Sequence, residues 1–472
     1  IAIELLGKYG YFSEGRTYTI ADPNEAWQLA IHQGNTWVAR RVQDNEIIYI
    51  PNNFMMDKVD ATDTKNVIVA PGMIERAIKN GRYKPAKEGV YSDFNYRVAV
   101  APAERRSADY NSSIGHPTLI YTCVKNAENK IIGKNITDPE QFPYSAVATK
   151  KWTVDDVKDL LRTHEHDIQE QDAQWTHTNS LGICRATTHE SEVFEMNANP
   201  LLITGYRALA RPCESPYIPF YPLARPAEGT AFMSWDKATA EHFKGTPEYF
   251  GWRSEWPVTT FVAAANTYDF QRQDQKDVRA FVEKLEAGWE KDVPAVTAHA
   301  KTLLKVSKEK AVEYLHAYNV RMLNEAQAAV AEKLEEKAPW TLAVMADSIN
   351  PKSDERVEVV LFSSGKLDAT KADPKQTWGG VGRASIGNKI TMSQKLAQPV
   401  KAEARDVDGD GLKDMVFTFT QKGLAQNMLA GANYDIWLHT YVDGKRVAAM
   451  DTAFIETEGY KGPAKRTQNA DL

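Results

Sequence analysis

Short runs of apolar residues, separated by polar turns, occupy much of residues 1–53 after a helical opening segment. The segments TYTIAD, AWQLAIH, TWVARRV and EIIYIPN are short and rich in β-branched and aromatic residues, and Asp-Pro, Gly-Asn and Asp-Asn turns separate them. This pattern is typical of strands joined by tight turns. The sequence therefore predicts an antiparallel meander in this region.

Helical spacing of apolar residues marks several other segments. The first residues, IAIELLGKYGYF, fit the end of an amphipathic helix, and PGMIERAIKNG and TVDDVKDLLRTH fit two more. Thr153 is a plausible N-cap for the last of these, because Asp155 and Asp156 fall in its first turn. Two long amphipathic helices, about Gln275–Ala300 and Lys308–Glu336, predict a helical hairpin over residues 275–336 that packs on the sheets.

The pattern changes again after Trp340. Strand-like runs (TLAVMA, RVEVVLF, MVFTFTQ, YDIWLHTYV and AAMDTAFI) alternate with polar turns, and long helical patterns are scarce. We expect a separate all-β sandwich domain over residues 340–458. The tail, residues 459–472, has few apolar residues to bury and is expected to be extended.

Composition limits the function classes. A chain of 472 residues is long enough for two or more domains. Its net charge is -6, and its 57 Lys and Arg residues are scattered, which argues against a nucleic-acid binder. No apolar run is long enough to span a bilayer. A homo-oligomer is compatible with the predicted hairpin and sandwich surfaces but is not indicated by them.

Cysteine and histidine spacing gives no metal motif. Cys123, Cys184 and Cys213 lie far apart without a CxxC pair, so a zinc or redox site is not expected. One disulfide with a free thiol and three buried thiols both remain open. His164 and His166 lie two residues apart after a predicted helix, where side chains face different ways, and we interpret them as a solvated helix end.

The sharpest local motif is DVDGDGLKD, residues 406–414. Asp406, Asp408 and Asp410 fall at loop positions one, three and five, Leu412 offers its carbonyl at position seven, and Asp414 stands at position nine. Hard oxygen donors at alternating positions of a tight loop suit Ca²⁺. Phe417 stands where an EF-hand has its bidentate glutamate, and a strand-like run follows, so we predict a calcium loop at a β-turn.

The expected role of this Ca²⁺ ion is structural, because close carboxylates repel one another until a cation offsets their charge. The alternative is an acidic turn that is simply solvated. The surrounding sequence, VEVVLFSSGKLDATKADPKQTWGG and MVFTF, resembles a β-sandwich module appended to bacterial secreted and surface proteins. This resemblance implies an extracytoplasmic location.

Four segments in the first three hundred residues carry a second resemblance. They are YFSEGRTYTIADPNEAWQLAI, WVARRVQDNEIIYIPNNFMM, ICRATTHES and RALARPCESPYIPFYPL. In order and spacing they are similar to the dipeptidase A family of N-terminal-nucleophile (Ntn) hydrolases. The resemblance implies an α+β fold for residues 1–338: an αββα sandwich in which an N-terminal Cys thiolate attacks a peptide carbonyl and its own α-amino group is the base.

The chain departs from this family at the nucleophile. It begins with Ile1, and the family's opening strands with the Cys have no counterpart in it. We therefore expect a fragment or a processed chain, with an upstream segment or a separate N-terminal subunit carrying the Cys. Neither Cys184 nor Cys213 has the free amine that this chemistry requires.

Two residues are candidates for the remaining catalytic roles. In IPNN, we select Asn52 over Asn53 as a side-chain donor to the oxyanion, by resemblance to related amide hydrolases. Arg185 could hold the nucleophile or a substrate carboxylate. The structural alternatives are a turn asparagine bonded to its own backbone and a salt bridge. The nearby aromatic loop SPYIPFYP could line a substrate cleft, although Pro-braced core packing fits most of its rings better.

Together these features predict an exported bacterial cysteine dipeptidase that acts on small peptides and carries a calcium-binding β-sandwich. One alternative is a catalytically inactive surface protein with a structural or interaction role on the same fold. Another is an amidase for non-peptide acyl amides.

Overall fold

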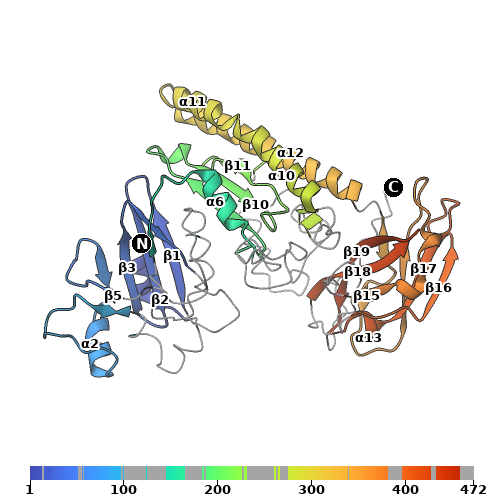
Figure 1. Ribbon diagram of the computed structural model, residues 1–472, viewed down its shortest axis with the longest axis horizontal. Coiled ribbons are helices and arrows are strands. Elements are labelled where there is room, and N and C mark those ends of the chain that lie inside the picture. Colours follow the sequence, from blue (N-terminus) through green and yellow to red (C-terminus); the bar gives the residue numbers. More distant parts are fainter. Residues whose placement is uncertain are drawn as a thin grey trace. The chain divides into compact units, whose positions relative to one another are not determined.

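The structure is a computed structural model. It describes residues 1–12, 15–50, 56, 58–96, 99, 124, 145–164, 183–184, 188–225, 228–230, 260–261, 264–265, 275–337, 340–380, 396–426 and 432–457. These residues form several sheets and helices (Figure 1), which confirms a chain of mixed α and β structure. Among the described helices, none is both long enough and apolar enough to cross a membrane. The predicted tail, 459–472, lies outside the described residues.

The chain divides into two compact units. The first comprises residues 1–186 and 193–204, and the second comprises residues 187–192 and 205–472. The unit boundaries fall within the residue ranges of β9 (Ser191–Glu195) and β10 (Thr204–Ala208). The predicted domain boundary near residue 340 stays a prediction.

The predicted meander is confirmed in the first unit. Strands β1 (Arg16–Ala21), β2 (Ala26–His32) and β3 (Thr36–Val42) are consecutive antiparallel neighbours, and β6 (Val67–Val69) completes the sheet in the order β1-β2-β3-β6. The inner strands have buried residues on both faces, as Leu29, Ala30 and Ile31 of β2 show. β1 is mostly exposed and forms one edge.

A hydrophobic core packs around this sheet. It combines residues of α1 (Ala2–Tyr9) and α2 (Met73–Lys79) with residues of the strands and loops. Among its buried members are Leu6, Leu29, Trp37, Val38, Met73, Phe94 and Tyr96. Two short antiparallel pairs lie in the same unit. They are β4 (Glu46–Ile48) with β8 (Ser145–Val147), and β5 (Lys58–Val59) with β7 (Phe94–Asn95).

A three-stranded sheet in the order β11-β10-β9 follows, with β11 at Ile218–Phe220 and a 3₁₀ helix, η2 (Pro200–Leu202), between β9 and β10. The aromatic segment that contains β11 is buried, and Tyr217 and Tyr221 each expose 0% of their surface. Core packing, rather than an open cleft wall, therefore describes these two rings. Trp252 and Trp256, the other rings considered for a cleft, lie outside the described residues.

Helices hold this aromatic segment by its backbone. The Glu286 carboxylate of α10 (Gln275–Glu290) accepts the Tyr217 N–H at 2.6 Å. The buried Asn319 side chain of α12 (Lys308–Lys337) accepts the Tyr221 N–H at 2.8 Å and donates to the Tyr221 carbonyl at 3.0 Å. Because these bonds satisfy buried backbone groups, the helices fix the path of the segment.

The helical region differs from its prediction in one respect. The sequence predicts one helix over about Gln275–Ala300, but α10 ends at Glu290 and α11 (Val293–Leu304) begins as a separate helix. Pro294 is the cause, because it lacks an N–H and is tolerated only in the first turn of a helix. α11 and α12 lie side by side (Figure 1).

Beyond residue 340 the described chain forms two four-stranded sheets. One has the order β12-β14-β17-β16, with strands at Leu342–Val344, Arg356–Leu361, Asp414–Thr420 and Lys401–Arg405. The other has the order β13-β19-β18-β15, with strands at Ser348–Ile349, Lys445–Ile455, Ala432–Val442 and Trp378–Gly380. Alternate residues of both sheets enter one core, as Phe417 and Phe419 of β17 and Ile436 and Leu438 of β18 show.

Candidate functional site

The predicted catalytic residues, Asn52 and Arg185, lie outside the described residues, as does Asn53. Their described neighbours show where they attach. Asn52 follows β4, which pairs with β8, and Arg185 directly follows the buried Cys184. Their roles in catalysis stay predictions.

The predicted calcium loop connects β16 to β17, so a strand follows it. Ligand atoms of Asp406, Asp408 and Asp414 lie within 4.8 Å of one another. Gly409 and Gly411 have φ angles of 81° and 87°, a region that favours glycine, and this lets the backbone turn sharply between the aspartates. The structure thus brings together three of the four predicted aspartates.

Backbone N–H groups orient these carboxylates. Asp406 accepts the N–H groups of Gly409 at 2.7 Å and Gly411 at 3.0 Å. Asp410 accepts the Leu412 N–H at 2.7 Å. The fit of the loop to a cation rests on these closely spaced oxygen donors, which are the type that Ca²⁺ prefers.

Asp414 differs from the other aspartates because it is fully buried, at 0% exposure. Its two oxygens accept the Ser363 N–H and the Val407 N–H, each at 2.9 Å. Ser363 follows β14, and Asp414 begins β17. Asp414 therefore fastens the loop to the sheet, in addition to lying in the acidic group.

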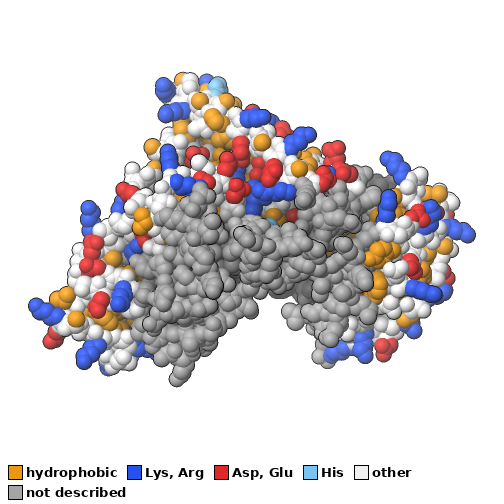
Figure 2. Space-filling model, viewed as in Figure 1, with side chains coloured by type: hydrophobic (Ala, Val, Ile, Leu, Met, Phe, Trp, Pro, Cys, Tyr) orange, Lys and Arg blue, Asp and Glu red, His pale blue; other side chains and the backbone are white. Residues whose placement is uncertain are grey.

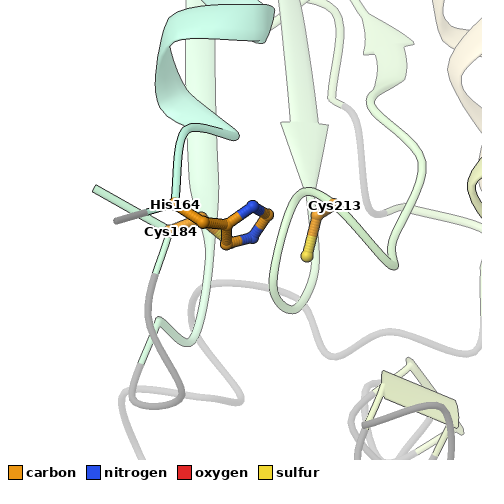
Figure 3. Close-up of side chains that lie close together, drawn as sticks. All are labelled: His164, Cys184 and Cys213. Atoms are coloured by element: carbon orange, nitrogen blue, oxygen red, sulfur yellow. The ribbon is translucent and has the colours of Figure 1, made fainter. Parts of the chain in front are cut away.

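The surroundings of His164, Cys184 and Cys213 were not anticipated. In the first unit, His164 and Cys184 lie side by side (Figure 3), because the Thr163 carbonyl accepts the N–H groups of Ile183 and Cys184, both at 3.0 Å. Cys213 belongs to the second unit. All three side chains are buried, with exposures of 8% for His164, 1% for Cys184 and 8% for Cys213.

The burial of His164 corrects the interpretation of a solvated helix end. α6 (Val154–Leu161) stops three residues earlier, and the chain after it turns inward. Helical spacing does not apply to residues beyond the end of a helix, which is why the sequence argument failed. His166 lies outside the described residues. Cys184 and Cys213 are not disulfide-bonded, and Cys123 lies outside the described residues.

The start of α6 is defined as predicted. The Thr153 hydroxyl accepts the Asp156 N–H at 3.2 Å, and the Asp156 carboxylate accepts the Thr153 N–H at 2.8 Å, which forms a capping box. Lys150 donates to Asp156 at 2.7 Å. The bonds from Lys150 and from Thr153 lower the pKa of Asp156 from 3.8 to about 2.

Surface charge on the described residues is mixed. In the face shown in Figure 2, Lys and Arg side chains are interspersed with Asp and Glu over the described surface. Ion pairs such as Arg279 with Glu283 and Arg405 with Glu358 belong to this mixed surface.

Comparison with known proteins identifies the family. Residues 1–278 match the family described as peptidase family C69, so the chain belongs to this family. The resemblance found in the sequence is thereby confirmed at the level of the family.

The curated relatives are named as dipeptidases. The chain is 23% identical over 236 residues to the "Probable dipeptidase" of Latilactobacillus sakei, which covers 48% of this chain and 47% of the relative. It is 24% identical over 215 residues to the "Probable dipeptidase" of Salmonella dublin, covering 44% and 47%. It is also 26% identical over 163 residues to "Dipeptidase A" of Lactobacillus helveticus, covering 34% and 32%. The chain spans about half the length, or less, of these relatives.

Proposed function

We propose that this protein is a dipeptidase that cleaves small peptides through an N-terminal cysteine nucleophile. The observation that carries the proposal is the match of residues 1–278 to peptidase family C69. The names of the relatives in Latilactobacillus sakei and Lactobacillus helveticus support dipeptides as the substrate class.

In this proposal, the nucleophile comes from a segment upstream of Ile1 or from a separate subunit, within an Ntn αββα sandwich. Its thiolate attacks the scissile carbonyl, the amine of the leaving amino acid takes a proton, and water then hydrolyses the acyl-enzyme. Asn52 donates its side-chain amide to the oxyanion, and Arg185 holds the nucleophile or the substrate carboxylate. Cys184 and Cys213 are unsuited to the nucleophile's role because both are buried within the chain.

The test uses the full-length, processed protein with a panel of dipeptides. We expect hydrolysis that is lost when the N-terminal cysteine is changed to alanine. Removal of one oxyanion donor, Asn52→Ala, should lower kcat by about 10²- to 10³-fold. Arg185→Lys keeps the charge but loses bidentate geometry, and should reduce activity less than Arg185→Ala.

Each alternative function predicts a different result in this assay. A native protein without an upstream cysteine, and without activity on any dipeptide, would contradict the peptidase proposal and favour a structural or interaction role. Activity on acylated amino acids but not on dipeptides would point to an amidase for non-peptide acyl amides.

We also propose that the loop at residues 406–414 binds one structural Ca²⁺ ion and that the protein acts outside the cytoplasm. The close spacing of the Asp406, Asp408 and Asp414 oxygens supports the metal. The two glycines at positive φ support the tight loop that such a site needs. An extracytoplasmic location would supply enough Ca²⁺ to fill a site of modest affinity. Isothermal titration with Ca²⁺ tests the first point, and a stoichiometry near zero would contradict it.

A further inference from the structure

The outer strand of the N-terminal sheet has one open edge. β1 pairs with β2 on one side, and no strand in the described part of the chain pairs with its other side (Figure 1). An open edge offers a row of backbone N–H and C=O groups to a further strand. We propose that β1 is an interaction surface whose partner is β1 of a second copy of this protein, paired antiparallel about a two-fold axis.

β1 lacks the features that usually protect an edge strand. Its sequence, RTYTIA, contains no proline and no lysine, and Arg16 at its start is its only charged residue. The side chains of Tyr18 and Ile20 are large and apolar, yet they are 48% and 47% exposed. Natural edge strands are commonly blocked by proline, lysine or a bulge. The exposed edge of β1 is therefore suited to pairing with another strand.

The turn between β1 and β2 determines which backbone groups point outward. The Asp22 N–H donates to the Glu25 carbonyl at 2.9 Å, so these two residues form a hydrogen-bonded pair, and the register of β1 with β2 continues from it. Hydrogen-bonded and non-bonded pairs alternate along an antiparallel ladder. Thr17, Thr19 and Ala21 therefore form the non-bonded pairs with β2, and their N–H and C=O groups point toward the open edge.

One register pairs all three outward residues with a second copy. With Thr19 on the two-fold axis, opposite Thr19 of the second copy, Thr17 lies opposite Ala21 and Ala21 lies opposite Thr17. Each of these pairs exchanges two backbone hydrogen bonds. A shift of one strand by two residues, which is the smallest shift that keeps outward groups opposed, leaves Thr17 or Ala21 without a partner in the strand. The backbone thus favours the register centred on Thr19.

The same register makes the side chains of one face complementary. Arg16, Tyr18, Ile20 and Asp22 are alternate residues, so they share a face. In the dimer, Tyr18 lies opposite Ile20 of the second copy, and Arg16 lies opposite Asp22 of the second copy. Aromatic residues opposite β-branched residues, and opposite charges across a strand pair, stabilise sheets. The two-fold axis repeats each contact, so the stripe is complementary to itself.

Both charged residues are available for this contact. Arg16 is exposed and forms no ion pair among the described residues. The Asp22 carboxylate accepts the N–H groups of Asn24 at 2.7 Å and Glu25 at 2.9 Å, both through Oδ1, which leaves Oδ2 for a partner. These two bonds lower the pKa of Asp22, so its carboxyl is ionised at neutral pH. Opposite charges therefore stand at the two ends of the self-complementary stripe.

The first measurement is sedimentation equilibrium of the full-length protein. A strand pair buries less surface than the roughly 1,200 to 2,000 Å² of stable complexes, so we expect a weak dimer with a micromolar dissociation constant. The mass should rise from one chain toward two between about 1 and 500 µM. Thr19→Pro should abolish the dimer and preserve the pairing with β2, because it removes only an outward N–H. Thr19→Val is the matched control and should dimerise.

A cysteine at position 19 tests the register directly. In the proposed dimer the two Cα atoms of residue 19 lie about 5.5 Å apart, within the range of about 4.4 to 6.8 Å that a disulfide spans. Thr19→Cys should therefore form a bond between copies under mild oxidation, identified by peptide mapping. Arg16→Cys is the control, because residue 16 is also exposed but its two copies would lie about 20 Å apart.

The charges at the ends of the stripe give a third test. Arg16→Glu places like charges opposite each other at both ends and should weaken the dimer about 10-fold. Arg16→Lys keeps the positive charge and should dimerise nearly as well as the wild type.

Three results would overturn the proposal. One is a full-length protein that remains a single chain at about 500 µM, and another is a dimer that Thr19→Pro leaves unchanged. The third is a Thr19→Cys variant that forms the bond between copies no faster than Arg16→Cys does. The cross-linking result decides the case even if the proline variant fails to fold.

Discussion

The loop at residues 406–414 and the pair of His164 and Cys184 each bring side chains together, but they are built in opposite ways. The loop is a local turn whose Asp406 and Asp408 side chains are exposed, and water can solvate its charges when no ion is bound. His164 and Cys184 are buried and come from separate segments, which backbone bonds to the Thr163 carbonyl hold together. A local, exposed group can form from its own segment, whereas a buried one must be held by the surrounding fold.

Asp414 is the exception within the loop, and changing it should give the largest effect. Asp414→Ala removes a buried acceptor and leaves the Ser363 and Val407 N–H groups without it. Since each lost bond to a charged group costs about 1.5 to 3 kcal/mol, we expect a loss of about 3 kcal/mol in the free energy of unfolding. Denaturant unfolding in the presence of a calcium chelator measures this, with the exposed Asp354→Ala as the control.

If Asp414→Ala lowers the free energy of unfolding only when Ca²⁺ is present, Asp414 does not differ in role from the exposed aspartates of the loop. Asp414 would then act as a ligand alone. Asp414→Asn, which retains one oxygen acceptor, should fall between the wild type and Asp414→Ala.

Removal of Ca²⁺ should have the next largest effect. At a Ca²⁺ concentration 100 times the dissociation constant, binding to the folded state adds about 2.7 kcal/mol of stability. A chelator should therefore lower the melting temperature of the wild-type protein, and Zn²⁺ at equal concentration should not restore it. Asp408→Asn should abolish most of this dependence, because it removes a carboxylate of the proposed Ca²⁺ site. Without Ca²⁺ it should change the free energy of unfolding little, because the Asp408 side chain is exposed.

The chelator effect is separable from general ionic strength. Mg²⁺ at the same concentration is the control, because it requires stricter octahedral geometry and dehydrates reluctantly. Equal stabilisation by Mg²⁺ and Ca²⁺ would indicate charge screening of the aspartates and would contradict a specific calcium site.

The two regions also show what a sequence can reveal. The grouping of Asp406, Asp408 and Asp414 was predicted correctly because the three residues lie within nine positions, so their spacing alone limits their geometry. The strands of the meander and the Thr153 cap were found for the same reason, since period and capping are local signals. Each depends on residues close together in the chain.

The proximity of His164 and Cys184 could not be found in this way. These two residues are twenty positions apart, and the bonds from the Ile183 and Cys184 N–H groups to the Thr163 carbonyl bring them together. The one available signal was weak: cysteine is often buried, and the segment ICR follows the helix that ends before His164. The break between α10 and α11 could have been predicted from Pro294, because a proline lacks the backbone N–H that a helix interior requires.

The cap of α6 is a local feature, and Thr153→Ala should have a smaller effect, lowering the free energy of unfolding by about 1 kcal/mol. The substitution removes the hydroxyl that accepts the Asp156 N–H, while Thr153→Ser keeps it and is the control. Denaturant unfolding measures the difference between the two variants. Equal stability of the alanine and serine variants would contradict a stabilising cap at the start of α6.

The smallest effect expected is a pH dependence that involves Asp156. The bonds from Lys150 and from Thr153 lower the pKa of its carboxyl from 3.8 to about 2. The ionised form is therefore favoured in the folded state, so its stabilisation is complete above pH 3.8 and is lost as pH falls toward 2. Because the side chain is partly exposed, we expect only about 0.5 kcal/mol. The difference in unfolding free energy between wild type and Asp156→Asn should hold constant from pH 7 to pH 5 and shrink below pH 4. A difference that grows on acidification would contradict this direction, because it would require the folded state to favour the protonated carboxyl at the start of α6.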